Sequence, residues 1–235
     1  MKKLICILLL FLLPLCAYSE STLTVTAEAV GSQYTVEGYP QTLYRLTVAN
    51  ASGKTVQALY AFAEIDREDL LVQEMADVNF DGHDDLVLMT RLGASNACYV
   101  FFLWDEARGQ FSTAGTPAIW NYTLYPEKAL LLSHANNGFA GILHESTVYG
   151  WENGTLKPLR SVAWETYLES RYDFGDGSYT YTEYSDDSRI VETYTVYGDG
   201  GDNAQQTFVF PTESYRDMSF YSAREAAENE FLGLN

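Results

Sequence analysis

The stretch D-V-N-F-D-G-H-D-D, from Asp77 to Asp85, constrains the fold of this chain more than any other segment. Asp, Asn and Gly dominate tight turns, and Gly82 allows a backbone conformation that a β-carbon would penalise. The apolar run L-V-L-M at residues 86–89 follows at once and is typical of a strand. We therefore expect a tight loop inside a β-hairpin.

Oxygen-bearing side chains occupy alternate positions of this loop: Asp77, Asn79 and Asp81, followed by a further carboxylate at Asp85. Side chains at alternate loop positions can point inward together, and the carbonyl of His83 is placed to give one more oxygen. Ca²⁺ takes about 6–8 oxygen ligands at about 2.3–2.6 Å. The spacing therefore predicts a calcium site made of these five residues. The alternative is a solvated turn that holds no metal.

The loop begins like an EF-hand, D-x-[DN]-x-[DN]-G, but does not end like one. Leu88 stands at position 12, where the EF-hand has its bidentate glutamate. We therefore expect the loop to close at Asp85 and to lie between two strands rather than between two helices. Asp84 adds negative potential but is out of register with the expected ligands.

Residues 1–19 have the pattern of a secretory signal peptide. Two lysines precede an apolar core, and small residues occupy the −3 and −1 positions of a cleavage site before Glu20. The apolar run is shorter than the roughly 20 residues that a membrane-spanning helix needs. A lipid anchor on Cys16 is the alternative, but Leu15 is large for the position before a lipidated cysteine. We expect an exported mature chain, periplasmic or extracellular, that does not insert into a membrane.

The balance of charges disfavours two classes of partner. The formal net charge is −18, and it becomes about −20 once Lys2 and Lys3 leave with the signal peptide. Nucleic acids and anionic membranes bind basic surfaces, so neither is an expected partner. An acidic chain suits cations and basic proteins, although acidic surfaces are also common among exported proteins. The expected partner is a protein or a glycan, and its identity and the oligomeric state stay open.

Cys98 is the cysteine that remains beyond the signal peptide, and it lies in the apolar run A-C-Y-V-F-F-L-W. It has no second cysteine to pair with, so we expect a buried free thiol that packs as a small hydrophobe. We accordingly expect no disulfide framework in the mature chain.

Threonine, tyrosine and valine alternate with polar residues along most of the chain, whereas long amphipathic helix patterns are nearly absent. Strand patterns occur near Leu23, Leu43 and Thr55, with turn residues between them. We predict a mainly β fold of antiparallel sheets and hairpins, in a small propeller-like or sandwich arrangement, with one short C-terminal helix.

Two segments of similar pattern indicate a weak internal repeat. In each, a strand ends in Trp followed by an acid, a turn follows, and the next strand begins with an apolar residue; the segments are residues 102–111 and 148–156. The two tryptophans, Trp104 and Trp151, are 47 positions apart, which suits a four-stranded unit of about 40–50 residues. The dipeptide Asn153-Gly154 predicts a type I′ hairpin turn.

The composition changes near Trp164, so we divide the mature chain into a β domain at residues 20–164 and a Tyr/Thr-rich segment at residues 165–235. Strict alternation in the second segment predicts a hairpin whose turn is at residues 185–188.

Residues 222–232 show the best helix pattern of the mature chain. Ser222 and Glu225 can form a capping box at its start, and Gly233 can end it. We expect Phe231 and Leu232 to dock this helix on a sheet.

The acidic loop, residues 77–85, lies in the segment M-A-D-V-N-F-D-G-H-D-D-L-V-L-M, and Y-V-F-F-L-W-D-E-A-R-G-Q-F follows downstream. Together these segments resemble the FG-GAP/VCBS-type repeats of bacterial secreted proteins and integrin-like propellers. The resemblance covers about residues 55–164. It implies a propeller-like, exported, calcium-binding protein whose ligands are the five loop residues named above. Some members of the small bacterial family that this stretch resembles are implicated as inhibitors of cell-wall hydrolases. This chain has one such loop and is too short for six or seven blades.

The leading functional hypothesis is a non-enzymatic binding protein with a structural calcium site. An inhibitor of a secreted cell-wall hydrolase is the first alternative, because many such enzymes are basic and complementary charge speeds association. A carbohydrate-binding protein is the second, because the Tyr-rich hairpin could present a row of aromatic rings, although such rows also stabilise exposed sheets.

An enzyme is disfavoured by the motifs. The three histidines, His83, His134 and His144, have no zinc-site spacing, and neither a G-x-S-x-G elbow nor a glycine-rich phosphate loop is present. Asp105 and Glu152 each follow a tryptophan at a hairpin end, where a solvated turn acid is the simpler interpretation.

Overall fold

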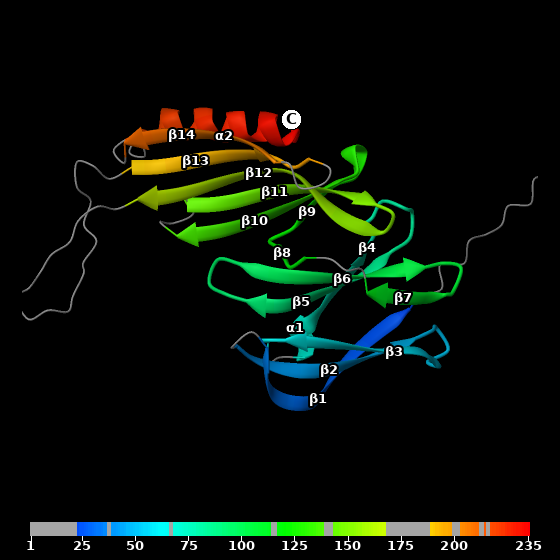
Figure 1. The fold of residues 1–235 in the computed structure, drawn as a ribbon. Coiled ribbons are helices and arrows are strands. Elements are labelled where there is room, and N and C mark those ends of the chain that lie inside the picture. Colours follow the sequence, from blue (N-terminus) through cyan, green and yellow to red (C-terminus); the bar gives the residue numbers. More distant parts are fainter. Residues whose placement is uncertain are drawn as a thin grey trace, which may run out of the picture.

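The structure is a computed structural model that describes residues 23–36, 39–65, 68–113, 117–138, 143–167, 189–198, 203–211, 214 and 217–235. The expected signal peptide, with Cys16, and the turn expected at residues 185–188 lie outside these ranges. Strands dominate the described chain and form three antiparallel sheets that follow one another in sequence (Figure 1). The predicted mainly β fold is confirmed.

The first sheet is a meander of three strands in chain order, β1 (Thr24–Val36), β2 (Tyr39–Ala49) and β3 (Thr55–Ala63). The Oδ1 atom of Asn50 holds the turn between β2 and β3, because it accepts hydrogen bonds from the backbone N–H groups of Ser52 and Lys54, both at 3.1 Å. A short asparagine side chain can replace a backbone acceptor in this way, which is why Asn favours turns.

The second sheet follows a four-residue helix, α1 (Glu68–Leu71). Its strands are β4 (Val72–Ala76), β5 (Asp85–Leu92), β6 (Ala97–Asp105), β7 (Gln110–Thr113) and β8 (Ile119–Trp120). Strands β4 to β7 are adjacent in chain order, and β8 pairs with β6. With β8 the sheet has five strands, whereas the spacing of Trp104 and Trp151 suggests a four-stranded unit.

The third sheet has six strands, and a 3₁₀ turn, η1 (Pro126–Lys128), separates the first two. The strands are β9 (Thr123–Tyr125), β10 (Leu130–Gly138), β11 (Leu143–Glu152), β12 (Thr155–Tyr167), β13 (Arg189–Val196) and β14 (Ala204–Pro211). They are adjacent in chain order. The expected boundary after residue 164 falls inside β12, which pairs with β11 on one side and β13 on the other. One sheet therefore runs across it.

Both hairpins of the predicted repeat are present. Trp104 is paired with Phe111 across β6 and β7, and Trp151 is paired with Leu156 across β11 and β12. The turn residues Asn153-Gly154 both have positive φ, at 51° and 73°. A type I′ turn needs positive φ at both central residues, so this prediction is confirmed.

Helix α2 (Met218–Leu232) covers the outer face of the third sheet (Figure 1). It begins earlier than the expected Ser222 because Asp217 caps it, with its Oδ1 accepting the backbone N–H of Ser219 at 2.8 Å. The expected end is confirmed: Gly233 has a φ of 76°, and its N–H donates to the carbonyl of Glu230 at 3.1 Å. Across the described ranges, no helix is both long and apolar enough to cross a membrane.

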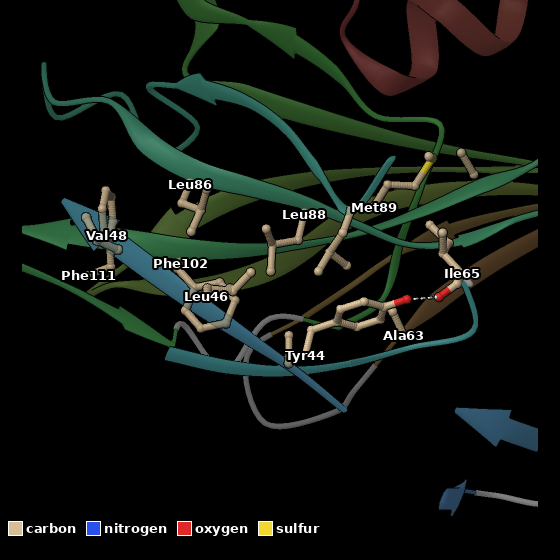
Figure 2. Packing of buried hydrophobic residues seen from close by; sticks show 13 residues of the cluster. Tyr44, Leu46, Val48, Ala63, Ile65, Leu86, Leu88, Met89, Phe102 and Phe111 are labelled. Atoms are coloured by element: carbon tan, nitrogen blue, oxygen red, sulfur yellow. Dashed lines mark hydrogen bonds between the residues drawn. The ribbon is translucent and has the colours of Figure 1, made fainter. Parts of the chain in front are cut away.

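The sheets and the helix are stacked in layers, with one hydrophobic core between each pair of layers. Figure 2 shows the core between the first and second sheets, where Tyr44 and Leu46 of β2 face Leu88 of β5. The hydroxyl of the buried Tyr44 donates a 2.6 Å hydrogen bond to the carbonyl of Ile65, so its polar atom is satisfied inside the core.

The middle sheet buries both of its faces, and this explains the uninterrupted apolar run after the acidic loop. Leu86 and Leu88 pack toward the first sheet, whereas Val87 between them packs in the second core, with Leu131 and Leu156 of the third sheet. A strand that is buried on both faces has no need to alternate apolar and polar residues.

Cys98 is buried in the same middle sheet and is a free thiol, as predicted. Burial is the main cause that raises the pKa of this thiol. A protonated, buried cysteine packs as a small hydrophobe.

Candidate functional site

The acidic loop, defined here as residues 77–85, joins β4 to β5. Ala76 at the end of β4 is paired with Asp85 at the start of β5, so the loop closes a β-hairpin. The prediction of a loop between two strands, rather than between two helices, is therefore confirmed.

The chain wraps around the carboxylate of Asp77. Its Oδ1 accepts the backbone N–H of Asp81 at 3.0 Å, and its Oδ2 accepts the backbone N–H of Gly82 at 2.9 Å. This path requires positive φ at Gly82, 91°, and also at Phe80, 63°. The role of Gly82 follows from the sequence, whereas nothing in the sequence marks Phe80 for this conformation.

Asn79 and Asp81 face each other across the loop. The Asn79 Oδ1 accepts the backbone N–H of Asp81 at 3.0 Å, and the Asn79 Nδ2 donates to the Asp81 Oδ2 at 2.9 Å. The other carboxylate oxygen of Asp81 accepts the backbone N–H of His83 at 3.0 Å. Asp77, Asn79 and Asp81 are thus brought together, as the alternation predicts.

Asp85 is buried at the base of the loop, with no exposed surface. Its Oδ2 accepts the backbone N–H of Val78 at 3.1 Å, and its Oδ1 accepts that of Trp104 at 2.8 Å. Burial is the main cause that raises its pKa to about 7, and the negative charges of Asp81 and Asp77 add to the effect. Asp85 therefore ties the loop to β6, a role that the sequence pattern does not reveal.

The Nε2 atom of the His83 imidazole lies 3.3 Å from the Oε2 atom of Glu106. Glu106 belongs to the turn between β6 and β7. The predicted role of His83 as a calcium ligand rests on its carbonyl oxygen, which this contact does not involve, and it stays a prediction.

The donors of the acidic loop suit a hard cation, because carboxylate, amide and carbonyl oxygens are the ligands that Ca²⁺ prefers. In the described part of the chain, however, no group of three or more His, Cys, Asp or Glu side chains has the arrangement of a metal site. The oxygens of Asp77 and Asp81 accept backbone N–H groups in this conformation. Each carboxylate oxygen has two lone pairs, so these contacts leave capacity for a cation. By residue type, Asp77, Asn79 and Asp81 are therefore compatible with calcium.

The acidic loop also contacts the third sheet. Val78 is fully buried and packs in the core between the second and third sheets. The indole Nε1 of Trp151 in β11 donates a 2.6 Å hydrogen bond to the Val78 carbonyl. The loop is therefore part of the contact between the second and third sheets and not only a surface turn.

A cavity of about 370 Å³ lies between the third sheet and α2. His144 of β11 is buried there, with its Nε2 atom 3.0 Å from the Oε2 atom of Glu228 in α2. Glu145, next in the strand, is exposed, because successive side chains of a strand point to opposite faces of the sheet. The pairing with Glu228 is not evident from the sequence, although Tyr221, Glu225, Glu228 and Leu232 have the spacing of one helix face.

A second cavity, of about 310 Å³, lies on the opposite face of the third sheet. Its lining combines two aromatic residues, Trp120 and Tyr149, with polar residues such as Asn96, Asn137 and Glu145. Aromatic rings beside a few polar groups are common in ligand sites.

Asp105 behaves as a turn residue: its Oδ1 accepts the backbone N–H of Arg108 at 3.1 Å. Glu152 is exposed at the end of β11. Both observations agree with the interpretation of these acids as solvated turn residues.

No family model and no curated protein matches this chain. A solved structure described as "Structure of a Xanthomonas Type IV Secretion System related protein" aligns with a TM-score of 0.46 at 14% identity, over 78% of this chain and 88% of that chain. A likeness this weak indicates neither a shared family nor a function. The resemblance to FG-GAP/VCBS repeats stays a hypothesis.

Proposed function

We propose that this chain is an exported calcium-binding protein whose calcium ion stabilises the fold, and that it acts by binding a partner and not by catalysis. The observation that carries the proposal is the acidic loop, where Asp77, Asn79 and Asp81 lie together at a hairpin end whose base is the buried Asp85. The resemblance of this segment to FG-GAP/VCBS repeats supports the same function.

Electrostatics explains why calcium would stabilise this loop. The carboxylates of Asp77 and Asp81 are close enough to raise the pKa of Asp85, so the three negative charges oppose one another. A divalent cation among them would remove that repulsion. Extracellular calcium modules typically bind with dissociation constants of about 10⁻⁴–10⁻³ M, which suits a structural ion better than a sensor.

The test is the melting temperature of the mature protein in EDTA and in millimolar Ca²⁺. At ten times its dissociation constant, calcium would add about 1.4 kcal/mol of stability, which corresponds to a rise of about 3–6 °C for a chain of this length. Asp81→Ala should abolish the calcium-dependent rise. Asp84→Ala is the matched control, because Asp84 is an exposed carboxylate of the same loop outside the ligand set; it should retain the rise.

Equal melting temperatures with and without calcium would contradict the proposal. The same holds if Asp81→Ala and Asp84→Ala lose the calcium response to the same degree, because calcium would then be acting through general charge screening.

A second candidate function is inhibition of a secreted cell-wall hydrolase. It is supported by the formal charge of −18, which complements the basic surface of many such enzymes. Titration of a basic muramidase with the mature protein should give stoichiometric loss of activity that weakens as salt is raised. Undiminished activity at a large excess of the protein would argue against this role.

A third candidate function is carbohydrate binding. The Tyr/Thr-rich segment that first pointed to it lies mostly outside the described residues. The second cavity supports it independently, because Trp120 and Tyr149 stand beside Asn96, Asn137 and Glu145. Binding of glycan fragments that is lost in Trp120→Ala but kept in Trp104→Ala would favour this role.

A further inference from the structure

The cavity of about 370 Å³ between the third sheet and α2 has the features of a ligand site. Its size falls within the range of about 300–1,000 Å³ that is common for small-molecule sites. Strands β10, β11 and β12 and the inner face of α2 supply its walls, including His134, His144, Trp164, Tyr221, Glu225 and Glu228.

Glu228 is the most informative residue of the cavity. Its side chain is 8% exposed, and its Oε2 lies 3.0 Å from the Nε2 atom of His144. The other oxygen, Oε1, is buried and has no hydrogen-bond partner among the described residues. A buried carboxylate oxygen that lacks a donor is unfavourable, so this atom calls for a donor from outside the chain.

The histidines beside it are already engaged. The Nδ1 atom of His134 lies 2.9 Å from the Ser146 Oγ, and its Nε2 lies 3.2 Å from the Asn136 Oδ1. The Nε2 of His144 contacts Glu228. Neither arrangement leaves a pair of imidazole nitrogens directed at a shared metal, and the described residues contain no group of three or more His, Cys, Asp or Glu side chains that could hold one. The missing partner of Glu228 is therefore a hydrogen-bond donor, which an ordered water or an organic ligand can supply.

The charges around the cavity favour a cationic donor. Glu225 and Glu228 both line it, and none of the lysines and arginines that the structure describes does. The nearby Arg224 is instead directed to Glu192 and the Tyr194 hydroxyl. Burial is the main cause that lowers the pKa of His134, so its ring adds no positive charge at neutral pH. The cavity thus carries a net negative charge.

Aromatic rings complete the cavity. The His144 ring is stacked on the Trp164 ring at a centroid distance of 5.1 Å, and Tyr221 meets Trp164 edge-on at 6.4 Å. Aromatic faces attract cations, and the attraction grows when water is excluded.

We propose that this cavity binds a small organic cation with N–H donors, a primary ammonium or a guanidinium, and that one N–H donates to the Oε1 atom of Glu228. Glu225 adds negative charge, and Trp164 and Tyr221 contact the apolar part of the ligand. The site is separate from the acidic loop and does not depend on the calcium proposal.

A panel of short-chain alkyl probes tests the ligand chemistry on the mature protein at constant calcium. The probes are butylammonium, butylguanidinium, butyltrimethylammonium, pentanol and pentanoate. Binding is followed by calorimetry and by the indole N–H resonance of Trp164 in ¹⁵N-labelled protein. The first two probes should bind and shift that resonance. The quaternary cation should bind more weakly because it has no N–H, and pentanol and pentanoate should not bind.

Three variants test the role of Glu228 in ligand binding. Glu228→Gln keeps the size of the side chain and removes its charge, and it should weaken butylammonium binding by about tenfold or more. Glu230→Gln removes the same charge from an exposed position of the same helix and should bind as the unaltered protein does. If Glu228→Gln fails to fold, Glu225→Gln, at an exposed position, should still weaken binding by a few fold.

Equal binding of butylammonium and pentanol would overturn the proposal, because charge would then play no part. So would unchanged affinity in Glu228→Gln, or amine binding that leaves the Trp164 resonance where it was. None of these results would bear on the calcium response of the melting temperature, so the two proposals can fail separately.

Discussion

The indole N–H of Trp151 and the carbonyl oxygen of Val78 form a 2.6 Å hydrogen bond that joins the third sheet to the acidic loop of the second. Val78 is fully buried, so its carbonyl would have little access to water if the indole were removed. The two residues are far apart in sequence, and the bond couples the acidic loop to the stacking of the sheets.

Trp151→Phe should therefore destabilise the protein by more than the loss of ring volume alone. The buried carbonyl of Val78 would lose its partner, which costs about 1–3 kcal/mol. Trp104→Phe is the matched control, because Trp104 occupies the equivalent hairpin position and packs on Phe111 at a ring distance of 5.0 Å. Urea unfolding of both variants gives the comparison. Equal losses of stability would show that the hydrogen bond contributes nothing.

Gly82→Ala should strain the acidic loop without any steric clash. Gly82 has a φ of 91°, and no atom lies within 4 Å of the position that a β-carbon would take. Backbone conformation alone would then cost about 1–2 kcal/mol. Gly93→Ala is the control, because Gly93 is a turn glycine outside the positive-φ region. If the two variants have the same free energy of unfolding, the loop tolerates a side chain at residue 82.

Arg224 and Glu192 form an ion pair between α2 and β13, and Glu192 has no exposed surface. The Arg224 guanidinium also lies over the rings of Phe208 and Phe210, at 5.1 and 5.0 Å from their centres. Arg224→Met would leave a buried carboxylate without its cation, and we expect a loss of about 3–5 kcal/mol.

The double variant Arg224→Met, Glu192→Gln checks the cause of that loss. Its neutral amide no longer needs a cation, so it should be more stable than Arg224→Met alone, and a double-mutant cycle gives the coupling. A double variant that is less stable than Arg224→Met would assign the loss to packing of the guanidinium on the aromatic rings.

His134 should make stability depend on pH in the weakly acidic range. Burial is the main cause that lowers its pKa below 6.5, and the neighbouring His144 lowers it further, whereas Asn136 and Glu228 act in the opposite direction. The unfolded chain therefore binds the proton more tightly than the folded protein. This contribution to stability is complete above pH 6.5 and is lost as the pH falls through the lower pKa of the folded state.

Urea unfolding at about pH 7 and about pH 5.5 measures this effect. The unaltered protein should lose more stability between the two values than His134→Gln, whose side chain does not titrate. Equal losses would place the pH dependence on other groups.

Much of the fold follows from the sequence. Several features depend on neighbours in the chain: the mainly β class, the two hairpins whose first strands contain Trp104 and Trp151, the type I′ turn at Asn153-Gly154, and the end of α2 at Gly233. Local preferences and side-chain periodicity are enough to predict such features. The predicted start of α2 is wrong because Asp217, five residues before Ser222, provides an equally good cap.

The composition of the acidic loop is likewise a local property. Alternating oxygen donors with a glycine in the turn are visible in nine residues, and the structure brings Asp77, Asn79 and Asp81 together as the alternation predicts. The role of Asp85, in contrast, is not a local property. Both of its carboxylate oxygens accept backbone N–H groups, and one of these groups belongs to β6. That contact exists only because β5 and β6 are adjacent.

The sequence by itself determined the strands, the turns and the acidic loop, because each arises from residues within a few positions of one another. Only the tertiary structure decided that three sheets and α2 stack in layers, that Trp151 reaches Val78, and that Glu228 meets His144 in a cavity. These contacts join residues 73 and 84 positions apart. Burial of apolar surface on both faces of the middle and third sheets brings them together, and no local pattern encodes which faces will meet.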